Sequence, residues 1–224
     1  PIPEHAVAYG VQVRLDGFAL RRPRQWGACW VADRLWRQLE LEAFWRERLP
    51  VSREGTDWRH VLQTLVTYRL IEPGSEWRLH RDWYRRSAMA DLLEEDFGLA
   101  QKDNLYRCLD KLLVHRRALF QHLRGRWEGL FGVQFQVLLY DLTSTYFESD
   151  PPWDPEDKRR FGYSRDKRSD CVRVILAVVL TPEGYPIGYE VLPGNTSDNT
   201  TLSATRQKVE EQYGSVERIW LMDR

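Results

Sequence analysis

The sequence predicts an α/β protein in which a mainly α-helical region, residues 1–130, precedes a mixed sheet, residues 131–224. Apolar residues recur at helical spacing in the first region, whereas they alternate with polar residues or form short apolar runs in the second. The strand-like runs and one helix follow in the order β-β-β-α-β. This order predicts a sheet with strands arranged 3-2-1-4.

Four helical stretches are expected in the first region. The first two carry apolar residues on one face, at Ala28, Ala32, Leu35, Trp36, Leu39 and Ala43 and then at Trp58, Val61, Leu62 and Leu65. A third helix is expected over Glu76–Phe97 with Ser75 as its N-cap, and a fourth over Asn104–Arg126, where Arg116 interrupts an apolar stripe. These helices predict a bundle with its own core.

A second interpretation of the helical region stays open. Arginines alternate with aromatic residues in Trp77–Ser87 and again in His115–Arg126. Such surfaces bind nucleic acid through phosphate contacts and base stacking. The region could therefore be a DNA-binding or dimerisation domain as well as a plain bundle.

Three strands open the second region. Alternating apolar residues begin at Val133 and lead into an apolar run that ends at Tyr140. Val172–Leu180 predicts a second strand, and the turn TPEGYP connects it to a third, Ile187–Leu192. Because a short turn joins the second strand to the third, we expect the three strands to form an antiparallel meander.

A crossover helix follows the meander. Leu202–Tyr213 is expected to be helical and to end at Gly214, and Arg218–Met222 is expected to be the fourth strand. A helical crossover brings this strand parallel to the first one. The first and fourth strands then point the same way.

Two aspartates follow these two strands. Asp141 comes after the apolar run in FQVLLYDLTSTYFE, and Asp223 comes after that in RIWLMDR. If the strands are neighbours, both carboxylates lie at the sheet edge where open α/β sheets bind ligands, about 4–7 Å apart. Close carboxylates repel unless a cation lies between them, and oxygen ligands favour Mg²⁺ or Mn²⁺. The pair predicts a metal site for phosphodiester chemistry, although either aspartate alone could simply cap a turn.

Longer motifs carry a family resemblance. The chain contains, in order, LIEPGSEWRLHRDW, KDNLYRCLDKLL, YDLTSTYFE, FGYSRDKRSDCVRVILAVVLTPEGYPIGYEVLPGNTSDNTTL and IWLMDR. The last three stretches resemble the catalytic core of insertion-sequence DDE transposases, in particular the IS-four family. The first two resemble the helical region that precedes that core.

The resemblance implies an RNase H-like fold, hydrolysis of a phosphodiester at the ends of a DNA element, and strand transfer into target DNA. It implies that Asp141 is the first catalytic acid and Asp223 the second, and that both bind Mg²⁺ or Mn²⁺. The third acid of the family, a Glu on a later helix, has no counterpart in residues 1–224, so we expect a fragment that stops before it.

The resemblance also implies partners and a location. The partners are double-stranded DNA, both as the terminal repeats of the element and as the target, and a second copy in an active homodimer. The implied location is the cytoplasm at the nucleoid, without a membrane. Two other function classes stay open: an RNase H-like nuclease, and a non-catalytic remnant that binds DNA or a partner transposase.

A basic segment lies between the first two strands. Residues 158–173 carry seven Lys and Arg against Asp166 and Asp170, a net charge of +5. The segment could follow a DNA backbone or could be a solvated loop. The residues proposed for DNA contact are Lys158, Arg159, Arg160, Arg165, Lys167 and Arg168.

Composition and residue spacing exclude some other classes of protein and site. The chain has 33 basic and 33 acidic residues, divided into a net +4 over residues 1–130 and −4 over 131–224. No apolar stretch approaches the roughly 20 residues of a membrane span. The three cysteines form no CxxC pattern and the five histidines show no ligand spacing, so we assign them no chemistry.

Overall fold

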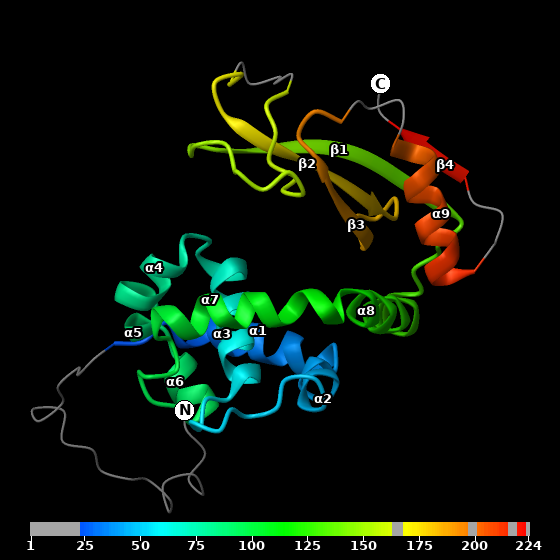
Figure 1. Ribbon diagram of the computed structural model, residues 1–224. Helices are drawn as coiled ribbons and strands as arrows, with labels where there is room; N and C mark the ends of the chain where they lie inside the picture. Colours follow the sequence, from blue (N-terminus) through cyan, green and yellow to red (C-terminus); the bar gives the residue numbers. More distant parts are fainter. Residues whose placement is uncertain (1–22, 163–167, 197–200, 215–218, 223–224) are drawn as a thin grey trace, which may run out of the picture. The chain divides into compact units, whose positions relative to one another are not determined.

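The chain divides into two units, residues 1–110 and residues 111–224 (Figure 1). The described part of the first unit is helical, and that of the second contains helices and a four-stranded sheet. The computed structural model describes residues 23–162, 168–196, 201–214 and 219–222. The units divide before the composition change at residue 131, because helix α8 (Arg116–Phe131) belongs with the sheet. The division into functional domains at residues 130 and 131 stays a prediction.

Short helices surround an aromatic core in unit 1. They are α1 (Trp26–Gln38), α2 (Leu41–Arg46), α3 (Trp58–Ile71), α4 (Glu76–Arg78), the π-helical turn η3 (Leu79–Trp83), α5 (Tyr84–Arg86), α6 (Met89–Leu93) and α7 (Lys102–Leu112). The side chains of Tyr68 and Trp83 are fully buried, with ring centroids 5.0 Å apart. Burial of such large rings is the main stabilising contribution to a small helical unit.

The helix expected over Glu76–Phe97 is wrong as a single element. Ser75 does cap its start, since the Ser75 hydroxyl accepts a hydrogen bond from the Arg78 amide. The backbone becomes extended at Ser87, whose hydroxyl donates to the Tyr84 carbonyl at 2.8 Å. Glu94, with φ of 55°, then ends α6. Serine favours such local hydrogen bonds over helix continuation.

The helix expected over Asn104–Arg126 is also two elements. Helix α7 ends at Leu112, and a 3₁₀ turn η4 (Leu113–His115) leads into α8. Arg116, the residue that interrupts the apolar stripe, begins α8. Its guanidinium donates to the Tyr189 carbonyl at 3.3 Å and to Glu190 at 3.2 Å, so a contact with the sheet explains the interruption.

The sheet confirms the predicted topology. Strands β1 (Val137–Phe147), β2 (Val172–Leu180) and β3 (Pro186–Pro193) form an antiparallel meander. Strand β4 (Ile219–Met222) pairs with β1 in parallel, and the strand order is β3-β2-β1-β4.

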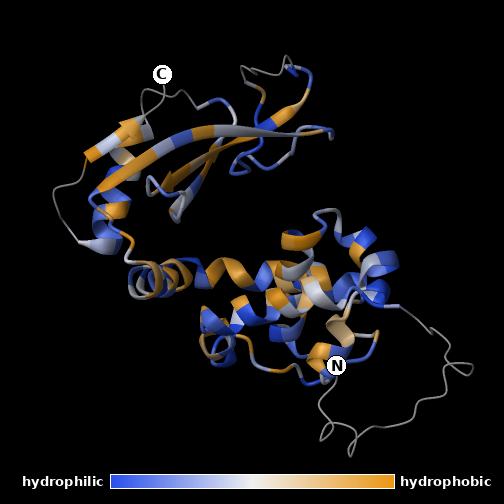
Figure 2. Ribbon diagram, turned by 180° about the vertical axis from the view of Figure 1, so that it is seen from behind, coloured by the Kyte–Doolittle hydropathy of each residue, from blue (hydrophilic) through white to orange (hydrophobic). Residues whose placement is uncertain are grey.

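Helix α9 (Thr201–Tyr213) is the crossover and packs on one sheet face. It ends at Gly214, whose φ of 83° is the left-handed conformation that glycine tolerates. Val209 of α9 packs with Leu138, Tyr140 and the buried residues of β2 and β3. Figure 2 shows β1 changing from apolar residues at its start to more polar residues along its length.

No helix in the described part of the chain is both long enough and apolar enough to cross a membrane.

Candidate active site

The parallel pair β1–β4 brings the two candidate strands together in register. Val137 pairs with Ile219, and the ladder continues to Tyr140 opposite Met222. The residues that follow in the sequence are Asp141 and Asp223. Asp223 lies outside the described residues, so the expected separation of the two carboxylates stays a prediction.

Asp141 lies on the sheet face opposite α9. Leu138 and Tyr140 are buried against the α9 side, and successive strand side chains alternate between faces. The Asp141 side chain is exposed, and its Oδ1 accepts a hydrogen bond from the Leu142 amide at 2.8 Å. Within the described part of the chain we find no ion pair to this carboxylate. An exposed, unneutralised carboxylate fits the chemistry of a hard cation ligand.

A buried hydrogen bond fixes the backbone just before Asp141. The Tyr140 hydroxyl donates to Thr201 Oγ1 at 2.8 Å, and both side chains are buried. This bond joins β1 to the first residue of α9. A buried hydrogen bond of this kind restricts the movement of β1 at the residue before Asp141.

Backbone hydrogen bonds join the two described ends of the basic segment, residues 158–162 and 168–173. Arg160 and Arg173 exchange two backbone hydrogen bonds, at 3.0 and 2.9 Å. Arg173 is buried, and its Nε donates to the Gly194 carbonyl at 2.9 Å. A Cβ at Gly194 would lie 2.1 Å from the Arg173 carbonyl oxygen, so this close approach requires glycine.

The proposed DNA-contact residues fall into three groups. Lys158 Nζ donates to the Val191 carbonyl, and Arg160 donates to the Arg159 and Pro155 carbonyls. Arg159 forms a bidentate pair with Asp157, and hydrogen bonds from Arg159 lower the pKa of Asp157 to about 2. The remaining residues are Arg168, which is described, and Arg165 and Lys167, which lie outside the described residues.

Arg168 lies beside the end of β1. Its guanidinium contacts Asp170 and Glu148, each at 3.0 Å, and lies over the Tyr146 ring. Hydrogen bonds to Asp170 and then to Glu148 raise the pKa of Arg168. A phosphate group would have to share or displace these carboxylates to bind here.

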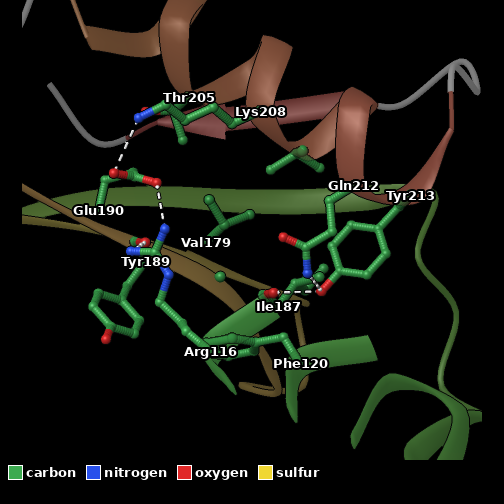
Figure 3. A pocket seen from close by; sticks show the side chains of 12 residues that line it. Arg116, Phe120, Val179, Ile187, Tyr189, Glu190, Thr205, Lys208, Gln212 and Tyr213 are labelled. Atoms are coloured by element: carbon green, nitrogen blue, oxygen red, sulfur yellow. Dashed lines mark hydrogen bonds and ion pairs between the residues drawn. The ribbon is translucent and has the colours of Figure 1, made fainter. Parts of the chain in front are cut away.

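A small cavity lies between α8, β3 and α9 (Figure 3). Its volume is about 30 Å³, which suits one or two waters. Glu190 bridges Arg116 at 3.2 Å and Lys208 at 3.0 Å across it. The Tyr213 hydroxyl donates to the Ile187 carbonyl at 2.7 Å. These contacts join α8 and α9 to β3, the edge strand of the sheet. The residues around this cavity therefore have a structural role.

Sequence reasoning assigned no role to His60. In unit 1 its Nδ1 lies 2.7 Å from Glu95 Oε1, and Asp57 completes a group of three ligand-type side chains. The spacing of Asp57 and His60 at the start of α3 is visible in the sequence and could have indicated that the two side chains lie close together. Glu95 is 35 residues beyond His60, and no pattern in the sequence links them.

Comparisons with known proteins give a distant likeness to solved structures. No protein-family model matches the chain, and no curated protein matches it. Among solved structures, a Mos1 transposase paired-end complex with left transposon end matches 73% of this chain and 51% of that chain, with 15% identity and a TM-score of 0.26. A pre-cleavage Mos1 transpososome matches 73% and 52%, with 14% identity and a TM-score of 0.27. The chain spans about half the length of these structures.

Proposed function

We propose that the chain is part of a DDE-type DNA transposase of an insertion sequence, with Asp141 and Asp223 as two of its metal-binding carboxylates. The supporting observation is the parallel register of β1 and β4, which ends with Tyr140 opposite Met222. The residue that follows each of these two in the sequence is an aspartate. The motifs around both aspartates resemble those of the IS-four family.

The roles of the residues follow from their positions. Asp141 and Asp223 would hold Mg²⁺ or Mn²⁺ at the sheet edge. When bound there, such ions stabilise the charge on the attacking and leaving oxygens of a phosphodiester. The Tyr140–Thr201 hydrogen bond holds the strand that carries Asp141. Rigid support of this kind keeps a catalytic carboxylate in position.

Double-stranded DNA is the proposed substrate, as the terminal repeats of the element and as the target, and the active form is proposed to be a homodimer. The segment from Lys158 to Arg173 is proposed to contact the phosphate backbone. Its anchoring to β2 through Arg160 and Arg173 supports this proposal, because an anchored basic segment loses less conformational freedom on binding.

Metal binding tests the carboxylate pair directly. Mn²⁺ added to the isotope-labelled chain should broaden the NMR signals of residues next to Asp141 and those at the end of β4, because a paramagnetic ion relaxes nearby nuclei. Asp141→Asn and Asp223→Asn should each abolish this broadening. Glu183→Gln, which changes an exposed acid in the β2–β3 turn, is the matched control. Broadening that persists in both aspartate variants would contradict the proposal.

DNA reactions separate the related functions. The resemblance implies three acids and residues 1–224 hold two of them, so we expect weak Mg²⁺ binding and little DNA cleavage by this chain. Robust cleavage abolished by Asp141→Asn would show that two carboxylates suffice. Strand-transfer products would identify a transposase, whereas cleavage without them would identify a nuclease. DNA binding without metal binding would favour the non-catalytic remnant.

The basic segment is tested by neutralisation. Changing Arg159, Arg160, Arg165 and Arg168 to Gln should weaken binding to all DNA sequences similarly and reduce its dependence on salt, because each lost phosphate contact lowers the number of counterions released. Fluorescence anisotropy at several salt concentrations measures both effects. Unchanged affinity and salt slope would leave the segment as a solvated loop.

A further inference from the structure

Three ligand-type side chains of unit 1 meet where α3 begins and where the chain leaves α6. Asp57 is the N-cap of α3, His60 lies in its first turn, and Glu95 follows α6. His60 Nδ1 lies 2.7 Å from Glu95 Oε1 and 4.0 Å from Asp57 Oδ2. One ligand atom from each residue lies within 4.8 Å of the other two.

We propose that Asp57, His60 and Glu95 bind a divalent first-row transition metal, with Zn²⁺ as the ion that fits best. Ligands of tetrahedral Zn²⁺ lie about 2.0–2.1 Å from the ion and therefore about 3.3 Å from one another. The observed distances from His60 Nδ1, 2.7 and 4.0 Å, lie on either side of that value. Small side-chain rotations would bring all three atoms to bonding distance.

The ligand types distinguish this site from the carboxylate pair at the sheet edge. An imidazole nitrogen suits Zn²⁺ and related transition metals, whereas Mg²⁺ prefers oxygen ligands alone and retains its waters. The side chains are also shielded from solvent, since His60 and Glu95 are only 23% and 28% exposed and Asp57 is buried. Groups of exposed acids on a protein surface lack this shielding.

A neighbouring arginine holds the Asp57 carboxylate in place. Arg59 Nε donates to Asp57 Oδ1 at 3.0 Å, and Arg59 Nη1 donates to Glu42 at 2.8 Å. The Arg59 backbone amide also donates to Asp57 Oδ1, and Arg59 Nη2 donates to Asp57 Oδ2, so Arg59 restrains both carboxylate oxygens. Outer-shell contacts of this kind orient metal ligands.

A cavity gives water access to the histidine. Its volume is about 290 Å³, and His60 lines it together with Asp33, Glu42, Gln63 and Glu94. Water from this polar cavity can supply the fourth ligand that three protein ligands leave open. The metal would connect the start of α3 to the chain after α6, across the 35 residues between His60 and Glu95. Its expected role is a cross-link that stabilises unit 1.

Thermal unfolding of the whole chain, after removal of metals with a chelator, tests this site. Equimolar Zn²⁺ should raise the melting temperature by at least about 5 °C, because an ion that binds only the folded state stabilises it. Mg²⁺ should not. Co²⁺, as a spectroscopic substitute, should give visible absorption bands at one ion per chain. The absence of a Zn²⁺-specific rise in melting temperature would overturn the proposal.

Variants assign the binding to these residues. His60→Gln and Glu95→Gln should each lower Zn²⁺ affinity about 10-fold or more and abolish the shift. Asp57→Asn should weaken binding while preserving an oxygen that can cap α3. Asp91→Asn, an exposed acid on α6, is the matched control, and Asp141→Asn tests independence from the sheet edge. Equal Zn²⁺ binding in the folded His60 and Glu95 variants, or its loss in Asp141→Asn, would overturn the proposal.

Discussion

The two units contain the same local motif in different surroundings. Asp57 in unit 1 and Asp157 in unit 2 each accept a hydrogen bond from the backbone amide two residues later and a bidentate contact from the arginine at that position. The Asp57 and Arg59 side chains are 11% and 18% exposed, whereas Asp157 and Arg159 are 24% and 36% exposed.

The connections of the two motifs also differ. Asp57 caps α3 and lies near His60, and Arg59 continues to Glu42, so the pair belongs to a network inside the helical core. Asp157 lies in the loop between β1 and β2. An ion pair contributes to stability mainly when solvent is excluded and when its loss leaves other polar groups unsatisfied. The comparison indicates that the Asp57–Arg59 pair contributes to the stability of unit 1, whereas the more exposed Asp157–Arg159 pair contributes less to that of unit 2.

The largest expected difference in stability is between the alanine substitutions of the two aspartates, Asp57 and Asp157. In metal-free protein, Asp57→Ala should destabilise unit 1 by about 2–4 kcal/mol, because it removes a helix cap and leaves Arg59 without one partner. Asp157→Ala should cause no measurable change in the free energy of unfolding. Urea unfolding followed by circular dichroism measures both. Equal effects of the two substitutions on the free energy of unfolding would contradict the proposed difference between the two motifs.

An ion pair within unit 2 tests whether burial, rather than the unit in which a pair lies, decides how much the pair contributes to stability. Glu190 is 16% exposed and bridges Arg116 and Lys208 (Figure 3). Glu190→Gln should destabilise unit 2 by about 1–2 kcal/mol, since two cations lose their shared carboxylate. Glu183→Gln, in an exposed turn, should change stability by less than about 0.5 kcal/mol. A negligible effect of Glu190→Gln would mean that burial does not explain the difference.

The smallest effect concerns pH. The pKa values of Asp57 and Asp157 are both below their ordinary value, so each carboxylate favours the folded state above the unfolded pKa of about 3.9 and loses that effect as pH falls through the folded pKa. The stability difference between wild type and Asp57→Asn should therefore narrow below about pH 4. Solvent screens the more exposed Asp157–Arg159 pair, so for Asp157→Asn the difference should stay near zero at every pH. Urea midpoints from pH 7 down to pH 3 measure these stability differences. A difference between wild type and Asp57→Asn that widens as pH falls would contradict the prediction.

Local patterns predicted the sheet well. The alternation that leads into β1, the apolar run of β2, the turn before β3 and the glycine after α9 each involve residues near one another in the sequence. Their structures could therefore be predicted from the sequence. The parallel pairing of β4 with β1 follows from the handedness and length of a helical crossover. The expectation that Asp141 follows the end of the first strand was wrong. Strand β1 continues to Phe147 and Asp141 is its fifth residue, because the pairing with β2 continues past the point where the pairing with β4 ends.

Helix boundaries were less readable because distant partners decide them. Arg116 looked like an interruption within one helix, yet it begins α8 because its guanidinium contacts Glu190, 74 residues away. Ser87 ends a helix through hydrogen bonds that compete with the helical ladder.

By itself, the sequence determined the order of the elements that build the sheet and the order of its strands, since periodicity and crossover geometry are properties of local segments. Only the tertiary structure decided that Asp57, His60 and Glu95 meet, and that one Asp–Arg motif is buried while its counterpart is partly exposed. The physical reason is that side chains 35 residues apart come together through the packing of whole helices, which depends on many weak contacts spread along the chain.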